Sequence, residues 1–408
     1  MAYLGFDDTD SRQGLCTTFL ATEFVRELRD WDLLGYPRLV RLNPNVTWKT
    51  RGNGALYLRF GRGRGTPSTV GEIGGEPVLA YPRGEPAPVD DALEERVRRT
   101  FERWCAFDDP TTHPGYALLN RRPSPGLYWR AVRTIVSVNE ALNAAKGCGR
   151  VRGYKEGRGR IGALAAVSWR PRDRTYEVLA YRQRARWGTP RDVDTASVVE
   201  MDRRFPSTFN NYDRENRHVV VAPRSPCPVL CGIRGDDPLD LPRALATLAG
   251  EPVDRWLLFE TNQGTDEHLV PANRAPLVPR TSVVVDGTVA GPPRTLPGGH
   301  VVVRVERPTG EVVDCTAYEP AKQLRRAVRA LWRGDRIRVC GSVRETPRTV
   351  NVEKFAIIEL TPGRRAIRSG WYEPPPSARR HLAKPLKRFT PAELARQGQH
   401  RTRALAAS

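Results

Sequence analysis

Apolar and polar positions at the start of the chain predict a strand, a polar loop and a helix. Tyr3–Phe6 is a short apolar run, and the loop Asp7–Gly14 follows it. An apolar residue then recurs at every fourth position, the spacing of an amphipathic helix, at Leu20, Phe24 and Leu28. Thr17 and Thr18 stand where the N-cap of this helix is expected. The opening unit is therefore expected to be strand, acidic loop, helix.

Similar patterns continue to about residue 275 and favour mixed α/β domains. Asp91–Cys105 has helical periodicity, and Val132–Val138 followed by Asn139–Lys146 is typical of a strand and then a helix. Residues 61–90 are rich in Gly and Pro, which predicts a loop or linker.

After about Thr281 the pattern changes to β-rich runs separated by Pro and Gly turns. The predicted order is three strands, one helix and two strands, at Thr281–Val289, His300–Val305, Glu311–Thr316, Ala321–Leu331, Asp335–Gly341 and Thr349–Leu360. This order is typical of an OB-fold β-barrel, and a generic small barrel is the alternative. We therefore divide the chain into an α/β region 1–275, an OB-fold 276–361 and a basic, Pro-rich C-terminal tail 362–408.

The charge balance points to a polyanionic partner. Lys and Arg number 66 against 46 Asp and Glu, a net charge of +20. Nucleic acid phosphates attract such a surface, although an Arg-rich genome or a heat-adapted proteome would also raise the Arg content. No apolar run reaches the ~20 residues of a membrane span, and Met1–Asp8 does not resemble a signal peptide. We expect a soluble cytoplasmic protein with no membrane partner.

The seven cysteines are scattered and form no CxxC pair, which argues against a disulfide framework or a zinc site. Cys227 and Cys231 are the closest pair, and we interpret them as buried structural thiols.

The acidic loop is the strongest candidate for chemistry. Asp7, Asp8 and Asp10 follow a strand and precede a helix whose free N–H groups can bind phosphate. Carboxylates repel phosphate unless a divalent cation bridges them, and Mg²⁺ suits such a site. These three carboxylates with the Thr17 hydroxyl therefore predict a magnesium–phosphate centre; the alternative is a solvated turn in which Asp10 or Ser11 caps the helix.

Two further kinds of segment could bind ligands. The Gly- and Arg-rich runs Gly147–Arg150 and Gly157–Ala163 could bring backbone N–H groups and guanidinium groups to an anion, although neither is a P-loop and both could be flexible loops. Thr208–Asp213 and Thr261–His268 are rich in amides and carboxylates, which suits either a polar ligand or Asx-turns.

Taken in order, these segments resemble motif blocks of one family, the archaeal isoleucine-tRNA agmatinylcytidine synthetases (TiaS). The similar blocks run through most of the chain, at Gly5–Thr18, Gly159–Ala166, Phe209–Asp213, Gly232–Gly235, Thr261–Asp266, Gly370–Pro375 and Ala378–Leu386.

The resemblance implies an ATP-dependent ligase that converts the wobble cytidine of an isoleucine tRNA with a CAU anticodon to 2-agmatinylcytidine. The family uses ATP and agmatine and yields AMP and phosphate. It combines a kinase-like domain, a ferredoxin-like domain, an OB-fold and a zinc ribbon. By its pattern, Thr17 is the phosphate-accepting residue, and Asp7, Asp8 and Asp10 lie in the Mg²⁺–ATP site.

Other candidate residues follow from the same blocks. We expect ATP to contact Thr18, Gly159, Arg160 and Gly162, and agmatine to contact Asn210, Asn211 and Asp213. The zinc ribbon should lie between the OB-fold and the block at Gly370, but only Thr361–Ser369 lies there, without cysteine. Neither a zinc ribbon nor a zinc site is therefore expected.

The chemistry of the base sets the tasks of such an enzyme. The C2 oxygen of cytosine is a poor leaving group, and phosphorylation converts it into phosphate, which an amine can displace. The protein must neutralise ATP, hold an extruded base and position the amine. The alternatives are a non-catalytic OB-fold RNA-binding protein and a tRNA modifier that uses another amine.

Overall fold

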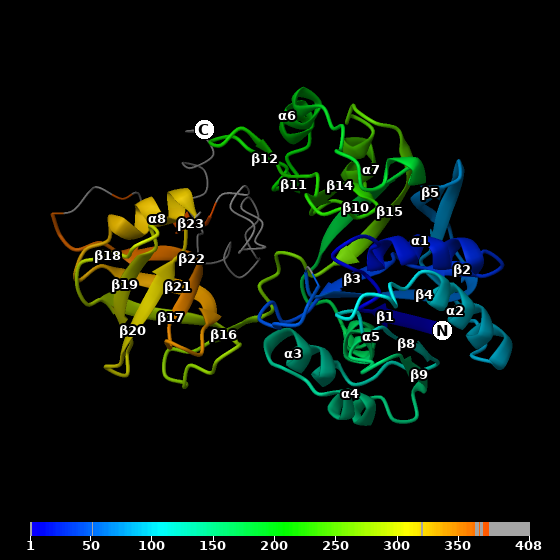
Figure 1. Ribbon diagram of the computed structural model, residues 1–408, viewed down its shortest axis with the longest axis horizontal. Coiled ribbons are helices and arrows are strands. Elements are labelled where there is room, and N and C mark those ends of the chain that lie inside the picture. Colours follow the sequence, from blue (N-terminus) through cyan, green and yellow to red (C-terminus); the bar gives the residue numbers. More distant parts are fainter. Residues whose placement is uncertain (1, 51, 320, 364–366, 368–369, 375–408) are drawn as a thin grey trace.

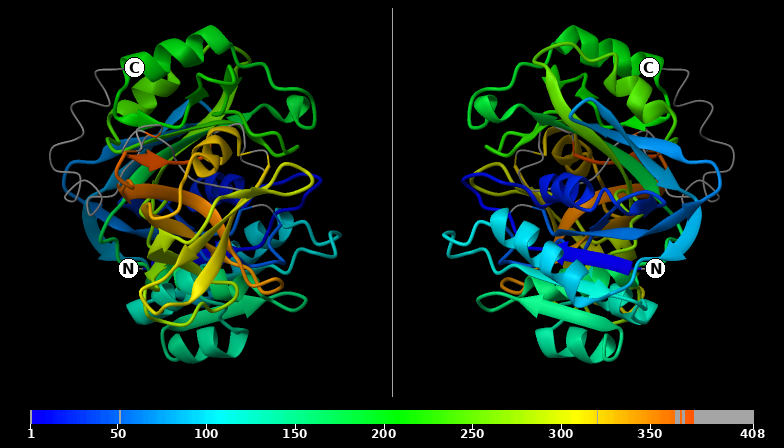
Figure 2. Two further views of the ribbon diagram at one scale, coloured as in Figure 1. Left: turned by 90° about the vertical axis from the view of Figure 1, so that its left-hand side faces the viewer. Right: turned by 90° about the vertical axis from the view of Figure 1, so that its right-hand side faces the viewer.

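The computed structural model describes residues 2–50, 52–319, 321–363, 367 and 370–374. Within these residues the chain forms an α/β part and a smaller β-barrel (Figure 1). Figure 2 shows the barrel from its own side, in yellow and orange, in front of the α/β part. None of the helices in the described ranges has the length and apolar character of a membrane span.

The α/β part is built on one large sheet, which has 13 strands among the described residues. Its strands are β1 (Ala2–Asp7), β2 (Asp32–Leu34), β3 (Arg38–Arg41), β4 (Gly54–Arg64), β5 (Ser68–Ile73), β6 (Glu76–Tyr81), β7 (Arg83–Pro86), β8 (Gly115–Leu119), β9 (Gly149–Gly153), β10 (Thr175–Arg182), β11 (Thr208–Phe209), β14 (Val229–Gly235) and β15 (Val253–Thr261). The main path runs β11-β14-β10-β15-β5-β6-β2-β4-β1-β8-β9, with β3 between β15 and β4 and with β7 on β4. The short strands β12 (Tyr212–Asp213) and β13 (His218–Val219) pair separately.

Helices cover both faces of this sheet, as expected for a mixed α/β domain. The α-helices of this part are α1 (Thr17–Glu27), α2 (Asp91–Arg103), α3 (Pro125–Arg133), α4 (Val138–Ala144), α5 (Gly159–Ser168), α6 (Thr195–Arg204) and α7 (Asp240–Leu245). A 3₁₀ turn occupies Arg184–Arg186. Strand β1 is central, because it pairs antiparallel with both β4 and β8.

The two faces of β1 differ in their packing. Leu4 and Phe6 are buried in the hydrophobic cluster that also contains α1 and α2. Gly5 points the other way, where a Cβ atom would lie 2.3 Å from the carbonyl oxygen of Ala163 in α5. Helix α5 can therefore rest directly on the backbone of β1 only because residue 5 has no side chain. The predicted strand, acidic loop and helix at the start of the chain are confirmed.

The prediction of a loop or linker at residues 61–90 was wrong. The end of β4, all of β5, β6 and β7 occupy this stretch. Gly61 and Gly63 are needed inside β4, because a Cβ atom would lie 1.9 Å from the carbonyl oxygen of Glu85 and 2.2 Å from the Tyr81 ring, respectively. Glycine here permits close packing between strands rather than ending them.

The prediction of a strand at Val132–Val138 was also wrong. Val132 belongs to α3, and Val138 is the first residue of α4. Each helix has its own start signal: Ser124 caps α3, and Ser137 forms a capping box with Glu140. These local bonds outweigh the β propensity of the valines between them.

The barrel contains its six predicted elements in the predicted order. Its elements are β16 (Leu269–Pro271), β17 (Ser282–Val289), β18 (Arg294–Thr295), β19 (Val301–Glu306), β20 (Val312–Ala317), α8 (Lys322–Arg329), β21 (Arg336–Val343), β22 (Val350–Glu359) and β23 (Trp371–Tyr372). The six predicted ones are β17, β19, β20, α8, β21 and β22, and the short strands β16, β18 and β23 were not predicted. The sheet runs β16-β17-β21-β22-β20-β19-β18 and closes through a further pairing of β17 with β19. Strand β16 already pairs with β17, so the barrel sheet begins before residue 276.

The remaining expectations fall partly outside the described residues. Residues 375–408, most of the predicted tail, lie beyond them, as do 364–366 and 368–369 in the short segment where the resemblance would place a zinc ribbon. The cysteines are free thiols, and Cys227 and Cys231 are buried as predicted.

We predict that Gly5→Ala separates α5 from β1. The new methyl group must displace the Ala163 carbonyl, and overpacking of this kind costs about 1–3 kcal/mol. Urea denaturation should show that loss in the free energy of unfolding.

Gly126→Ala in α3 is the matched control. Its Cβ atom would meet only the Ser124 hydroxyl at 3.6 Å, an ordinary contact, and alanine is the better helix former. Equal stability of the two variants would contradict the role assigned to Gly5.

Candidate active site

The acidic loop turns sharply at the carboxyl end of β1. Asp8 has a φ of 57°, in the left-handed region that aspartate tolerates better than most residues. Its backbone N–H donates to Asp7 Oδ1 at 2.8 Å, and its own Oδ2 accepts from the backbone N–H of His113 at 3.0 Å. The loop then returns to α1, where the Thr9 hydroxyl donates to the Thr17 hydroxyl at 3.2 Å. These bonds hold the acidic residues over the start of the helix.

Helix α5 begins directly against the same turn. A Cβ atom on Gly162 would lie 1.8 Å from Asp7 Oδ2, and one on Gly159 would lie 2.5 Å from the carbonyl oxygen of Asp7. On the other side, a Cβ atom on Gly115 would lie 2.4 Å from the backbone nitrogen of Arg160. Glycine at these positions allows the first turn of α5 to contact the backbone of β1 and β8.

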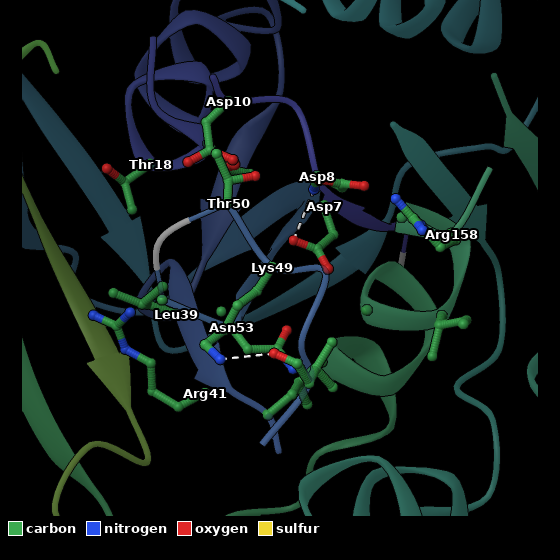
Figure 3. A pocket seen from close by; sticks show the side chains of 18 of the residues that line it. Asp7, Asp8, Asp10, Thr18, Leu39, Arg41, Lys49, Thr50, Asn53 and Arg158 are labelled. Atoms are coloured by element: carbon green, nitrogen blue, oxygen red, sulfur yellow. Dashed lines mark hydrogen bonds between the residues drawn. The ribbon is translucent and has the colours of Figure 1, made fainter. Parts of the chain in front are cut away.

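A cavity of about 290 Å³ lies between these elements (Figure 3). It is lined by seven of the residues that the sequence had indicated, namely Asp7, Asp8, Asp10, Thr17, Thr18, Gly159 and Gly162. The structure thus brings together segments that lie about 150 residues apart in the chain.

Two helix N-termini open into this cavity without a side-chain cap. Neither Cys16 at the start of α1 nor Arg158 at the start of α5 caps its helix through a side chain. Helices α2 and α6 are capped by Asp90 and Asp194. The first N–H groups of α5 donate instead to backbone carbonyls, those of Gly159 and Arg160 to His113 and Gly157. The positive end of the helix dipole at each N-terminus favours anions such as phosphate.

Desolvation changes the acidity of the Asp7 and Asp8 carboxyl groups. It raises the pKa of Asp7 well above the ordinary aspartate value, and the neighbouring charge of Asp8 raises it further. It also raises the pKa of Asp8 to about 6, although the His113 amide favours the ionised form. The charge of Asp8 therefore disfavours ionisation of Asp7, and the charge of Asp10 disfavours ionisation of both, which a bound cation would relieve.

No group of three His, Cys, Asp or Glu side chains in the described ranges forms a ready-made metal cage. Mg²⁺ commonly uses one or two carboxylates together with phosphate oxygens, so a complete protein cage is not required. The half-buried neighbouring carboxylates of Asp7 and Asp8 fit that mode of binding.

Sequence reasoning missed the cationic side of the cavity. Arg41, Lys49 and Arg158 line it, opposite or beside the acidic turn (Figure 3). Arg158 lies within the Gly- and Arg-rich run, but the spacing alone did not show which arginine faces the cavity. Arg160 instead turns back, and its guanidinium donates to the carbonyl oxygens of Gly157 at 2.9 Å and Glu156 at 3.3 Å.

The candidate agmatine residues do not line this cavity. Asn210, Asn211 and Asp213 lie at the turn between β11 and β12, and all three are buried. Asn211 Nδ2 donates to Thr208 Oγ1 at 2.8 Å, and Asp213 Oδ2 accepts from Asn216 Nδ2 at 2.7 Å. Asn211 and Asp213 are thus engaged with neighbouring side chains, whereas the side-chain amide of Asn210 is buried without a hydrogen-bond partner among the described residues.

The segment Thr261–His268 links the cavity to the barrel. Asn262 Oδ1 accepts from the Arg41 backbone N–H at 2.6 Å, and its Nδ2 donates to the Arg41 carbonyl at 2.9 Å. A few residues later, His268 Nε2 lies 3.2 Å from Glu353 Oε2 in β22. A second cavity of about 820 Å³ lies along this segment, between the α/β part and the barrel. It shares part of its lining with the first cavity, at Arg41, Leu42, Lys49, Gly52 and Asn53.

Comparison with known proteins agrees with this geometry. The TiaS TCKD domain matches residues 3–155, and the TiaS FLD domain matches residues 157–268. The isoleucine-tRNA 2-agmatinylcytidine synthetase TiaS of Methanocaldococcus jannaschii is 37% identical over 442 aligned residues, covering 95% of this chain and 98% of the relative.

Solved structures give the same result. The crystal structure of TiaS in complex with its isoleucine tRNA and ATP is 35% identical, with a TM-score of 0.82, and the match covers 96% of this chain and 98% of the solved one. The complex of TiaS with the same tRNA, AMPCPP and agmatine has a TM-score of 0.79 at 33% identity, with the same coverage. The resemblance inferred from the sequence is thus confirmed, and the chain belongs to the TiaS family.

Proposed function

We propose that this chain is an ATP-dependent isoleucine-tRNA 2-agmatinylcytidine synthetase, which joins agmatine to the wobble cytidine of the anticodon. The observation that carries the proposal is the cavity in which the acidic turn, two uncapped helix N-termini and cationic side chains meet. An RNA-binding protein without catalysis has no use for buried carboxylates beside a phosphate-binding helix end. The similar proteins are named for this reaction and were solved with isoleucine tRNA, ATP and agmatine.

The acidic turn and the starts of α1 and α5 bind ATP. The positive ends of α1 and α5 attract phosphate oxygens, and Gly159 and Gly162 let the first turn of α5 lie directly against Asp7. Thr17 accepts phosphate, and Thr18 in the same turn of α1 contacts the nucleotide. Arg160 supports the loop before α5 through its bonds to Gly157 and Glu156.

Mg²⁺ would be held by Asp7 and Asp8, with Asp10 nearby, and would supply charge neutralisation for the phosphates. The chain's own part is to keep both carboxylates fixed, through the bond to the Asp8 N–H and the bond from His113. Arg41, Lys49 and Arg158 add positive charge around the transferred phosphoryl group.

The chemistry of the cytosine C2 position determines which bonds form and break. A phosphoryl group of ATP is transferred to the C2 oxygen of cytosine, and the remaining nucleotide is the leaving group of this step; the primary amine of agmatine then attacks C2 and loses a proton. The C–O bond breaks, phosphate leaves, and a C–N bond remains. Orientation of amine and base accounts for much of the acceleration of such a step.

The barrel is assigned as an OB-fold that binds the tRNA. Its order of elements and its closure support this assignment, and the net charge of +20 favours a phosphate backbone as partner. The second cavity, beneath the barrel, leads from this surface to the reaction site.

We predict that Thr17→Ala and Asp8→Ala each lower agmatine incorporation by more than about 100-fold, because each removes a group that contacts the transferred phosphate or its cation. Mass spectrometry of tRNA after incubation with ATP and labelled agmatine measures the product. Thr69→Ala, on an exposed position of β5, is the matched control and should remain active. Normal activity of Thr17→Ala would remove the hydroxyl from the mechanism.

The raised pKa of Asp8 gives a prediction about stability. Burial favours the protonated form in the folded state, so the metal-free protein should lose stability as pH rises from about 4 to about 6. Asp8→Asn cannot ionise and should lack this part of the loss. Its Tm should therefore exceed that of the wild type at pH 8, with little difference at pH 4. A lower Tm for Asp8→Asn at pH 8 would contradict the assignment.

For agmatine, a cation at both ends, we propose the turn Asn210–Asp213 as a contact, since a carboxylate and two amides can bind guanidinium. Asp213→Asn should raise the KM for agmatine at unchanged KM for ATP in steady-state assays. Asp237→Asn, at an exposed position before α7, is the control. An unchanged KM for agmatine with Asp213→Asn would exclude this turn.

A further inference from the structure

One large aromatic side chain is partly exposed at the mouth of the reaction cavity. Trp48 lies on the loop between β3 and β4, lines the cavity, and is 39% exposed. Ile135, on the loop between α3 and α4, is 36% exposed and lines the same cavity. Large apolar groups exposed beside a polar site are typical of ligand contacts.

The cationic wall connects Trp48 to the acidic turn. The guanidinium carbon of Arg158 lies 5.9 Å from the centroid of the Trp48 ring. Arg158 also acts electrostatically on Asp8, and both side chains line the cavity (Figure 3). A flat ligand on the indole would therefore have its edge within reach of the phosphoryl site.

We propose that Trp48 is the platform on which the extruded wobble cytosine stacks while its C2 oxygen faces the acidic turn. The inference rests on the proposed function and adds the residue that holds the base. Aromatic side chains stack on bases of any sequence because every base offers a π-face, and a base extruded from an anticodon loop needs such a replacement partner. The Arg158 guanidinium contacts the Trp48 ring and lies between this ring and the proposed phosphate site.

The position of Trp48 favours the RNA base over the adenine of ATP. The neighbouring Lys49, with Gly52 and Asn53 on the same loop, lines both the reaction cavity and the larger cavity beneath the barrel. The loop thus stands between the phosphoryl site and the proposed tRNA surface. A partly exposed ring at this boundary meets the macromolecule that arrives from the barrel side.

The test pairs removal of the ring with removal of the base. The full-length wild type and Trp48→Ala are titrated with two anticodon stem-loop RNAs that differ only at the wobble position, cytidine or abasic, in the presence of a non-hydrolysable ATP analogue. Dissociation constants come from fluorescence anisotropy. Stacking of one base on an aromatic side chain corresponds to about a 5- to 150-fold change in affinity.

If Trp48 stacks on the base, the abasic RNA should bind the wild type about 5- to 150-fold more weakly than the cytidine RNA. In Trp48→Ala the two RNAs should bind within about twofold of each other, since the partner of the base is gone. Additive effects, or no effect of the abasic site on the wild type, would overturn the proposal. Trp48→Phe should keep most of the difference and Trp48→Leu should lose it, which separates stacking from bulk.

Two further readouts complete the design. Trp31→Ala is the matched control. The guanidinium carbon of Arg62 lies 4.3 Å from the centroid of the Trp31 ring, so this tryptophan also contacts an arginine. Trp31 follows the C-terminal end of α1, however, whereas the cavity lies at the N-terminal end of that helix. The control variant should discriminate between the RNAs as the wild type does. A raised KM for ATP in Trp48→Ala with unchanged RNA binding would assign the ring to adenine and overturn the proposal. Failure of the wild type to modify the isoleucine tRNA would instead contradict the proposed function itself.

Discussion

The direct contact of α5 with β1 is the constraint on which the site depends. Gly5, Gly159 and Gly162 remove the side chains that would hold the helix away, and the first turn of α5 then lies against the Asp7 backbone. Because β1 pairs on both sides within the sheet, the position of Asp7 is fixed by three elements at once. The helix end and the carboxylates are therefore preorganised relative to each other, which is what electrostatic catalysis requires.

This arrangement is unfavourable without ligands. Asp7 and Asp8 are half-buried next to each other, and desolvation and repulsion by Asp8 both raise the pKa of Asp7. Neither Cys16 nor Arg158 caps its helix through a side chain, although the first N–H groups of α5, on Gly159 and Arg160, donate to the carbonyl oxygens of His113 and Gly157. The positive ends of the two helix dipoles favour an anion, and the neighbouring carboxylates favour a cation, so the site suits the two kinds of ligand together.

Local signals in the sequence predicted the acidic loop, helix α1 and the order of barrel elements, because each depends on neighbours in the chain. Long-range packing decided the rest. Glycines 61 and 63 suggested a loop but serve a close strand contact, and the valines at 132–138 suggested a strand but lie across two capped helices. Whether Arg158 or Arg160 faces the cavity depends on the placement of α5 against Gly115, which no local pattern encodes.

The segment Thr261–His268 shows why the barrel and the reaction cavity act as one unit. Asn262 fixes the backbone of Arg41 at the cavity wall, while His268 and Asp266 pair with Glu353 and Lys354 of β22. Because few residues separate these contacts, a shift of the barrel must strain either the ion pairs or the Asn262 bonds. If the barrel binds the tRNA as we propose, the RNA would thereby be held at a defined distance from the acidic turn. From the sequence, the amides and carboxylates of Thr261–His268 could have served either ligand binding or Asx-turns. In the structure this segment connects the barrel to the cavity wall.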